Sequence, residues 1–138
     1  MDPNNAVVKL CAEGMSAEQE GRLADARALF ERAWAARSDD FEACVAAHYL
    51  ARRQESEEER LAWNEEALRR ADAVADERVS QFYPSLLLNL GHSHEVLGAL
   101  ELARHFYALA AQRVDELPDD RYGSVVRSGL ARAKARVG

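Results

Sequence analysis

Residues 84–110 read PSLLLNLGHSHEVLGALELARHFYALA, and this stretch predicts two short helices joined at Gly98. Apolar residues recur at steps of three and four on both sides of the glycine, which places them on one face of each helix. Pro84 can open the first helix because its missing N–H would have no intrahelical partner there. Gly91 and Ala103 are small, so the two helices can approach closely where they cross. The stretch therefore predicts a helical hairpin with one buried seam.

The spacing of these residues resembles the tetratricopeptide repeat, whose 34-residue pattern reads W-x2-L-G-x2-Y, then A-x3-F, then a proline. Four residues fit the pattern outright: Leu90, Gly91, Ala103 and Ala110. Leu87 stands where the pattern has Trp, and His94 stands where it has Tyr. The resemblance implies an all-α fold. Its antiparallel helix hairpins would stack in a right-handed superhelix of about seven helices.

The same pattern divides the chain into three repeats within a single domain. Repeat 1 covers about residues 7–40, repeat 2 about 41–83 and repeat 3 about 84–117, and a capping helix follows at about 120–137. Repeat 2 is degenerate and is also longer than the pattern. We expect its surplus, around residues 72–83, to extend the fourth helix or to lengthen the start of the fifth.

Local signals predict several helix ends. Gly21 ends the first helix, and Asp2 is placed to cap its start ahead of Pro3. Ser56, with Glu59 three residues later, forms a capping box that opens the fourth helix. The last helix has an apolar packing face and a basic face. We place Tyr122, Val125, Val126, Gly129, Leu130 and Ala133 on the packing face.

Charge and cysteine content narrow the class of protein. The 138-residue chain has a net charge of −6, but residues 121–138 carry five bases and no acid. A mostly acidic body argues against nucleic-acid binding, which usually needs a basic face. Cys11 and Cys44 suggest no disulfide framework, and neither a signal peptide nor a membrane-spanning apolar run is present. The sequence predicts a soluble cytoplasmic protein that does not bind a membrane.

No motif in the sequence indicates an enzyme or a cofactor. The phosphate-binding loop, the nucleophile elbow and the C-x-x-C pair are all missing. His92 and His94 are the most tempting metal ligands, but residues two apart on a helix point about 200° apart. We therefore expect no metal site. His94 should fill the packed tyrosine position of the repeat, and His92 should face outward.

The resemblance also implies where a partner binds, because the first helix of each tetratricopeptide hairpin lines a concave groove. The groove residues carried over to this chain are Cys11, Met15, Val45, Tyr49, Arg52, Arg53, Leu88 and His92. The apolar ones should form a floor, and contiguous exposed apolar surface usually marks a binding site. Arg52 and Arg53 should lie at one edge and favour an acidic partner.

The sequence thus predicts a scaffold or adaptor that binds a peptide or helix of another protein in this groove. The alternative is a self-associating structural scaffold. In that case the basic last helix of one copy docks on an acidic surface, or in the groove, of another copy. A small-ligand-sensing regulatory domain is a third interpretation, with no motif behind it.

Overall fold

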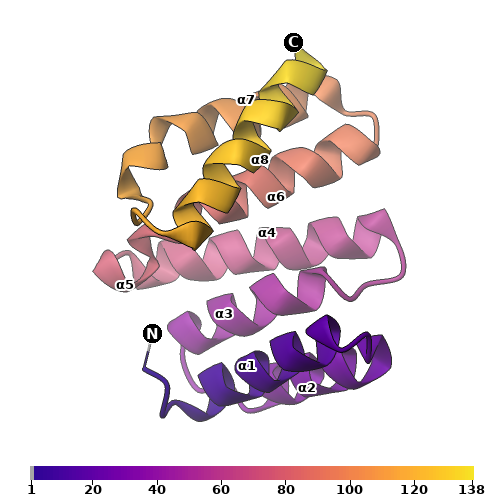
Figure 1. Cartoon of the computed structure of the whole chain (residues 1–138), viewed down its shortest axis with the longest axis vertical. Coiled ribbons are helices and arrows are strands. Elements are labelled where there is room, and N and C mark those ends of the chain that lie inside the picture. The colour runs from indigo at the N-terminus through magenta and orange to yellow at the C-terminus, as the bar shows by residue number, and fades with distance from the viewer. Residues whose placement is uncertain (1) are drawn as a thin grey trace. The chain divides into compact units, whose positions relative to one another are not determined.

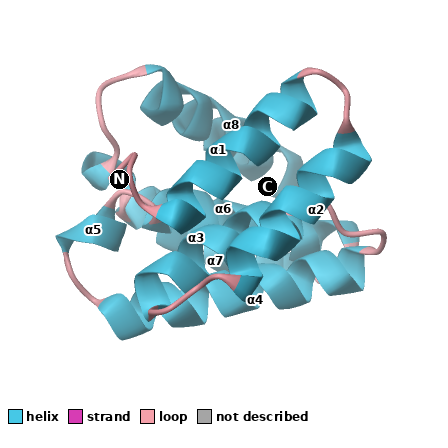
Figure 2. Cartoon of the chain, turned by 90° about the horizontal axis from the view of Figure 1, so that it is seen from below, coloured by secondary structure: helices cyan, strands magenta, loops and turns pink. Residues whose placement is uncertain are grey.

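The structure, a computed structural model, describes residues 2–138. Figure 2 shows helices joined by short loops, with no strand in this part of the chain. The contacts divide the chain into two compact units, the first ending at Val74 and the second running from Ala75 to Gly138. The expected all-α class is confirmed, with helices packed antiparallel. The superhelix and the single domain stay predictions.

The first unit contains two helical hairpins. Its helices are α1 (Ala6–Gln19), α2 (Leu23–Ala35), α3 (Asp40–Ala51) and α4 (Glu57–Val74). Figure 1 shows α1 beside α2 and α3 beside α4, and α3 also packs against both α1 and α2. Burial therefore extends around most of α3, at Phe41, Ala43, Cys44, Val45, Ala46, Ala47, Leu50 and Ala51. Four of these eight residues are alanines, and such small side chains fit between closely packed helices.

The second unit is one hairpin covered by a third helix. Its elements are α5 (Glu77–Ser80), α6 (Tyr83–Val96), α7 (Leu100–Gln112), a 3₁₀ turn (Val114–Glu116) and α8 (Arg121–Val137). Figure 1 shows α8 crossing the α6–α7 hairpin, and α8 contacts both of those helices. No helix in residues 2–138 is both long and apolar enough to cross a membrane.

The surplus residues of repeat 2 form a separate short helix. The expectation that they extend the fourth helix or lengthen the start of the fifth is therefore wrong. Helix α4 stops at Val74, and Ala75 then takes the left-handed conformation with φ of 51°. The carboxylate of Asp76 accepts the N–H of Arg78 at 2.9 Å and so caps α5. Residues 2–138 consequently contain eight α-helices rather than about seven.

Other helix ends follow local chemistry. Gly21 and Gly98 have φ of 78° and 84°, a conformation that costs an L-residue energy, and each closes its hairpin as expected. The N–H of Glu59 donates to Oγ of Ser56 at 3.1 Å, which confirms the capping residue of α4. The prediction that Asp2 caps α1 is wrong. Asn5 caps it, because its Oδ1 accepts the N–H of Val7 at 2.9 Å.

The two units contain the same hairpin, with equivalent residues 77 positions apart. A Cβ on Gly14 of α1 would lie 2.2 Å from Cε1 of Phe30 on α2. A Cβ on Gly91 of α6 would lie 2.4 Å from Cε1 of Tyr107 on α7. The four alanines of the pattern are fully buried at equivalent places: Ala26, Ala33, Ala103 and Ala110. In each hairpin, a glycine allows the helices to approach and an aromatic ring fills the space.

The middle hairpin replaces this pair with polar residues. His48 and Asn64 lie 34 positions after Gly14 and Phe30. Asn64 is 3% exposed, and Nδ1 of His48 is shielded from solvent without a hydrogen-bond partner. Burial, and to a lesser extent the charge of Arg52, lower the pKa of His48 from 6.5 to about 4. The imidazole is therefore neutral in the folded protein near neutral pH.

Candidate functional site

The first unit places the predicted groove residues in two different environments. Cys11 and Val45 are only 2% and 3% exposed, so they belong to the core rather than to a surface floor. Met15 and Tyr49 are half-buried on α1 and α3, and they occupy equivalent places 34 residues apart. The floor expected in this unit therefore reduces to Met15 and Tyr49. The prediction failed at Cys11 and Val45 because the interior of this unit extends to those positions of α1 and α3.

Burial also determines the chemistry of both cysteines. It raises the pKa of Cys11 and of Cys44 from 9.0 to about 12, although the nearby Arg52 partly opposes the shift at Cys11. The thiolate is the nucleophilic and metal-binding form of cysteine, and it is scarce at neutral pH when the pKa is this high. Cys11 and Cys44 are free thiols within the core, and they have a packing role.

Tyr49 connects the surface of the first unit to its core. Its ring stacks on the buried ring of Phe30, with centroids 5.4 Å apart and planes inclined by 21°. The guanidinium carbon of Arg52 lies 5.1 Å from the centroid of Tyr49, within the range of a cation–π interaction. One side of the tyrosine is therefore fixed by packing, while the residue remains partly open to solvent.

Arg52 and Arg53 share one carboxylate. Both pair with Glu18 at the end of α1, Arg53 through its Nε at 3.0 Å from Oε2. The Glu18 side chain is only 12% exposed, whereas that of Arg52 is 40% exposed. Two positive charges meet one negative charge, so this edge of the surface keeps one net positive charge. Arg52 remains accessible to a further anionic group.

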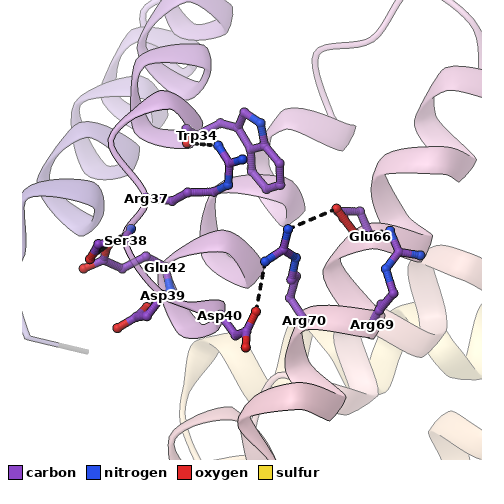
Figure 3. A network of polar contacts seen from close by, with 9 residues as sticks. All are labelled: Trp34, Arg37, Ser38, Asp39, Asp40, Glu42, Glu66, Arg69 and Arg70. Atoms are coloured by element: carbon purple, nitrogen blue, oxygen red, sulfur yellow. Dashed lines mark hydrogen bonds and ion pairs between the residues drawn. The ribbon is translucent and has the colours of Figure 1, made fainter.

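A polar network holds the start of α3, which carries Tyr49 (Figure 3). The N–H of Glu42 donates to Asp39 Oδ1 at 2.8 Å, which caps the helix. Glu42 in turn accepts the N–H of Ser38 at 2.7 Å. From α4, Arg70 reaches Asp40 at 2.9 Å and also pairs with Glu66. These contacts join the α2–α3 turn to α4 and fix the rotation of α3.

In the second unit, α8 covers part of the predicted groove face of α6. A Cβ on Gly129 would lie 3.4 Å from Cδ2 of Leu88, and Leu88 is half-buried. His92, one turn further along α6, is exposed as expected. The hydroxyl of Tyr107 and the guanidinium of Arg136 both donate to Glu95, at 2.7 and 2.9 Å. These bonds, from Arg136 most of all, lower the pKa of Glu95.

Glu18 and Glu95 are equivalent residues, 77 positions apart, and each receives an arginine from beyond its hairpin. In the first unit the arginines follow α3, and in the second Arg136 comes from α8. Helix α8 therefore lies on α6 in the manner in which α3 lies on α1. The resemblance to the repeat pattern did not predict this equivalence.

One apolar residue that was expected on the packing face of α8 is exposed. Val125 is 61% exposed, whereas Tyr122, 40% exposed, has a hydrogen bond with Ser85 of α6. The buried stripe of α8 instead runs through Val126, Leu130, Ala133 and Val137, at steps of four, three and four. Val125 lies one residue outside this stripe, and a stricter comparison of the helical spacings could have separated it.

The remaining histidines give no sign of a metal centre. The ring of His94 stacks on that of Phe106 with centroids 5.4 Å apart, which is a packing role. Within residues 2–138 no three His, Cys, Asp or Glu side chains gather in a way that could hold a metal ion. Comparison of the chain with protein-family models, with curated proteins and with solved structures gives no match.

Proposed function

We propose that this protein is a tetratricopeptide-like adaptor that holds a peptide or helix of a partner protein. The repeat construction supports the family assignment. Gly14 with Phe30, and Gly91 with Tyr107, pair a glycine and an aromatic at the places where the family pattern has its G and F. Helical repeats of this kind commonly present the first helices of their hairpins to partners.

The surface that supports binding best lies in the first unit, around Met15, Tyr49 and Arg52. The single observation that carries the proposal is the sharing of Glu18 by two arginines beside the half-buried ring of Tyr49. An apolar ring next to an excess positive charge suits a peptide that carries an apolar side chain and a carboxylate. Arg52 would orient the acidic group, and Met15 and Tyr49 would supply apolar contact.

The structure also decides which variant tests this proposal cleanly. A charge at Tyr49 would disturb the stack on Phe30, so a loss of binding could come from a loss of folding. Met15 is a better position, because it is only half-buried at the surface of α1. Arg32, an exposed residue of α2, provides a matched position elsewhere on the same unit.

The experiment replaces Met15, and separately Arg32, with the photo-crosslinking residue p-benzoylphenylalanine in the full chain. Each protein is irradiated in lysate of the native host, and crosslinked products are identified by mass spectrometry. We expect a partner that crosslinks from position 15 and not from position 32. Adding Arg52→Gln should abolish that product while circular dichroism shows a nearly unchanged melting curve, because Arg53 still pairs with Glu18. The same products from both positions would overturn the proposal.

A further inference from the structure

The outer face of α8 combines positive charge with apolar surface. Arg121, Val125 and Arg132 lie at i, i+4 and i+11, which places them along one side of the helix, and we call them the basic stripe. All three are exposed, Val125 to 61%. Within residues 2–138, neither Arg121 nor Arg132 forms an ion pair. The stripe therefore has unneutralised charge on both sides of an exposed valine.

The outer face of α4 carries the opposite pattern in its first two turns, before Arg69, whose charge is paired with Glu66. Glu58, Ala62 and Glu65 lie at i, i+4 and i+7 along one side of this helix, and we call them the acidic stripe. All three are exposed, whereas the opposite side of α4 buries Asn64, Ala67 and Ala71. In the part of the chain that the structure describes, neither Glu58 nor Glu65 forms an ion pair.

We propose that the basic stripe of one copy of this protein docks antiparallel on the acidic stripe of a second copy. Val125 then packs over Ala62, a large side chain against a small one. Because a helix rises about 1.5 Å per residue, Arg121 lies level with Glu65 within about 2 Å. Arg132 lies beyond Glu58 by about 5 Å along the axis, a gap that the arginine side chain spans.

Charge complementarity selects a second copy as the occupant. Residues 1–120 carry 24 acids and 13 bases, while residues 121–138 carry five bases and no acid. The antiparallel direction also sets the helix dipoles in the favourable sense, because the C-terminal half of α8 meets the N-terminal half of α4. Surface ion pairs are individually weak, so this contact should form at low salt and weaken as salt screens it.

Sedimentation velocity of the full chain tests the contact. At about 20 mM salt, where screening is slight, we expect a species of at least twice the 15.4 kDa monomer. Salt at about 0.5 M should return it to monomer. Two charge-reversed variants, Arg121→Glu with Arg132→Glu and Glu58→Lys with Glu65→Lys, should each be monomeric at low salt. All four positions are exposed, so both variants should keep the wild-type melting curve.

Mixing the two variants gives the decisive result. The acidic α8 of the first variant then faces the basic α4 of the second, so association should return in a one-to-one mixture. Lys9→Glu with Arg32→Glu makes the same change in net charge as the Arg121/Arg132 variant, at exposed positions of α1 and α2, and it should associate like wild type. A wild-type monomer at low salt, a loss of association in this control, or no recovery on mixing would each overturn the proposal.

Discussion

The ring of Phe30 occupies the space that a side chain on Gly14 would need: a Cβ there would lie 2.2 Å from Cε1 of the ring. Gly91 and Tyr107 have the same relationship in the second unit. Both aromatic residues are fully buried, so the ring cannot move toward solvent without opening the interior. The glycine is thus required by packing, although both glycines lie inside helices, where glycine is unfavourable.

Replacing Gly91 with alanine should destabilise the protein by about 1–3 kcal/mol, the usual cost of overpacking a core. The gain in helix propensity, about 1 kcal/mol, is too small to offset the clash with Tyr107. Gly129→Ala is the matched control, because its Cβ would lie 3.4 Å from the flexible end of Leu88. That variant should be neutral or slightly more stable. Urea unfolding followed by circular dichroism checks both, and equal effects would contradict the packing argument.

The hydroxyl of Tyr107 should contribute to stability through Glu95. Tyr107→Phe keeps the ring against Gly91 but removes the 2.7 Å hydrogen bond, so we expect a loss of about 0.5–1.5 kcal/mol. Phe30 fills the equivalent place without a hydroxyl, which shows that the ring alone satisfies the packing. In a double-mutant cycle, the effect should disappear when Glu95 is already alanine, which offers no acceptor to the hydroxyl. An additive cycle would mean that the hydrogen bond adds nothing.

The sequence predicted the hairpins well because they depend on local signals. Pro84, Gly21 and Gly98 act through their own backbone conformation, and the helix ends follow them closely. The extra helix α5 is capped by Asp76, but it was missed because α4 ends at Ala75, which adopts a left-handed conformation unusual for alanine. No residue pattern near Ala75 signals its left-handed conformation.

The candidate site was harder to predict because exposure is a property of the assembled unit. Val45 has the groove position of its repeat, yet it is buried within the most enclosed helix of its unit. Val125, one residue away from the buried stripe of α8, turned out exposed. Helical spacing alone gives the relative direction of side chains, and the neighbouring helices decide which directions are covered.

Both cysteines should be unreactive in the folded protein. Burial raises the pKa of Cys11 and Cys44 to about 12, so the thiolate is scarce at about pH 8 and reagent has no access. Ellman's reagent should therefore react slowly with the native protein and rapidly with two thiols per chain in denaturant. The native protein should react faster in the Gly14→Ala variant than in the Gly91→Ala variant. Gly14→Ala loosens the unit that holds both cysteines. Rapid reaction of the untreated wild type would contradict the burial of these residues.

His48 should make the protein less stable in mild acid. Its pKa falls from 6.5 to about 4 on folding, chiefly through burial, so the unfolded chain takes up a proton first. The contribution of His48 to the free energy of unfolding is fully present above pH 6.5. It is lost as the pH falls toward 4, by at most about 1.4 kcal/mol per pH unit. His48→Asn should flatten the dependence of the unfolding free energy between about pH 7 and pH 5, above the range of most carboxylates. His92→Asn, at an exposed histidine, should leave the wild-type slope unchanged. If both variants keep that slope, the acid sensitivity does not come from His48.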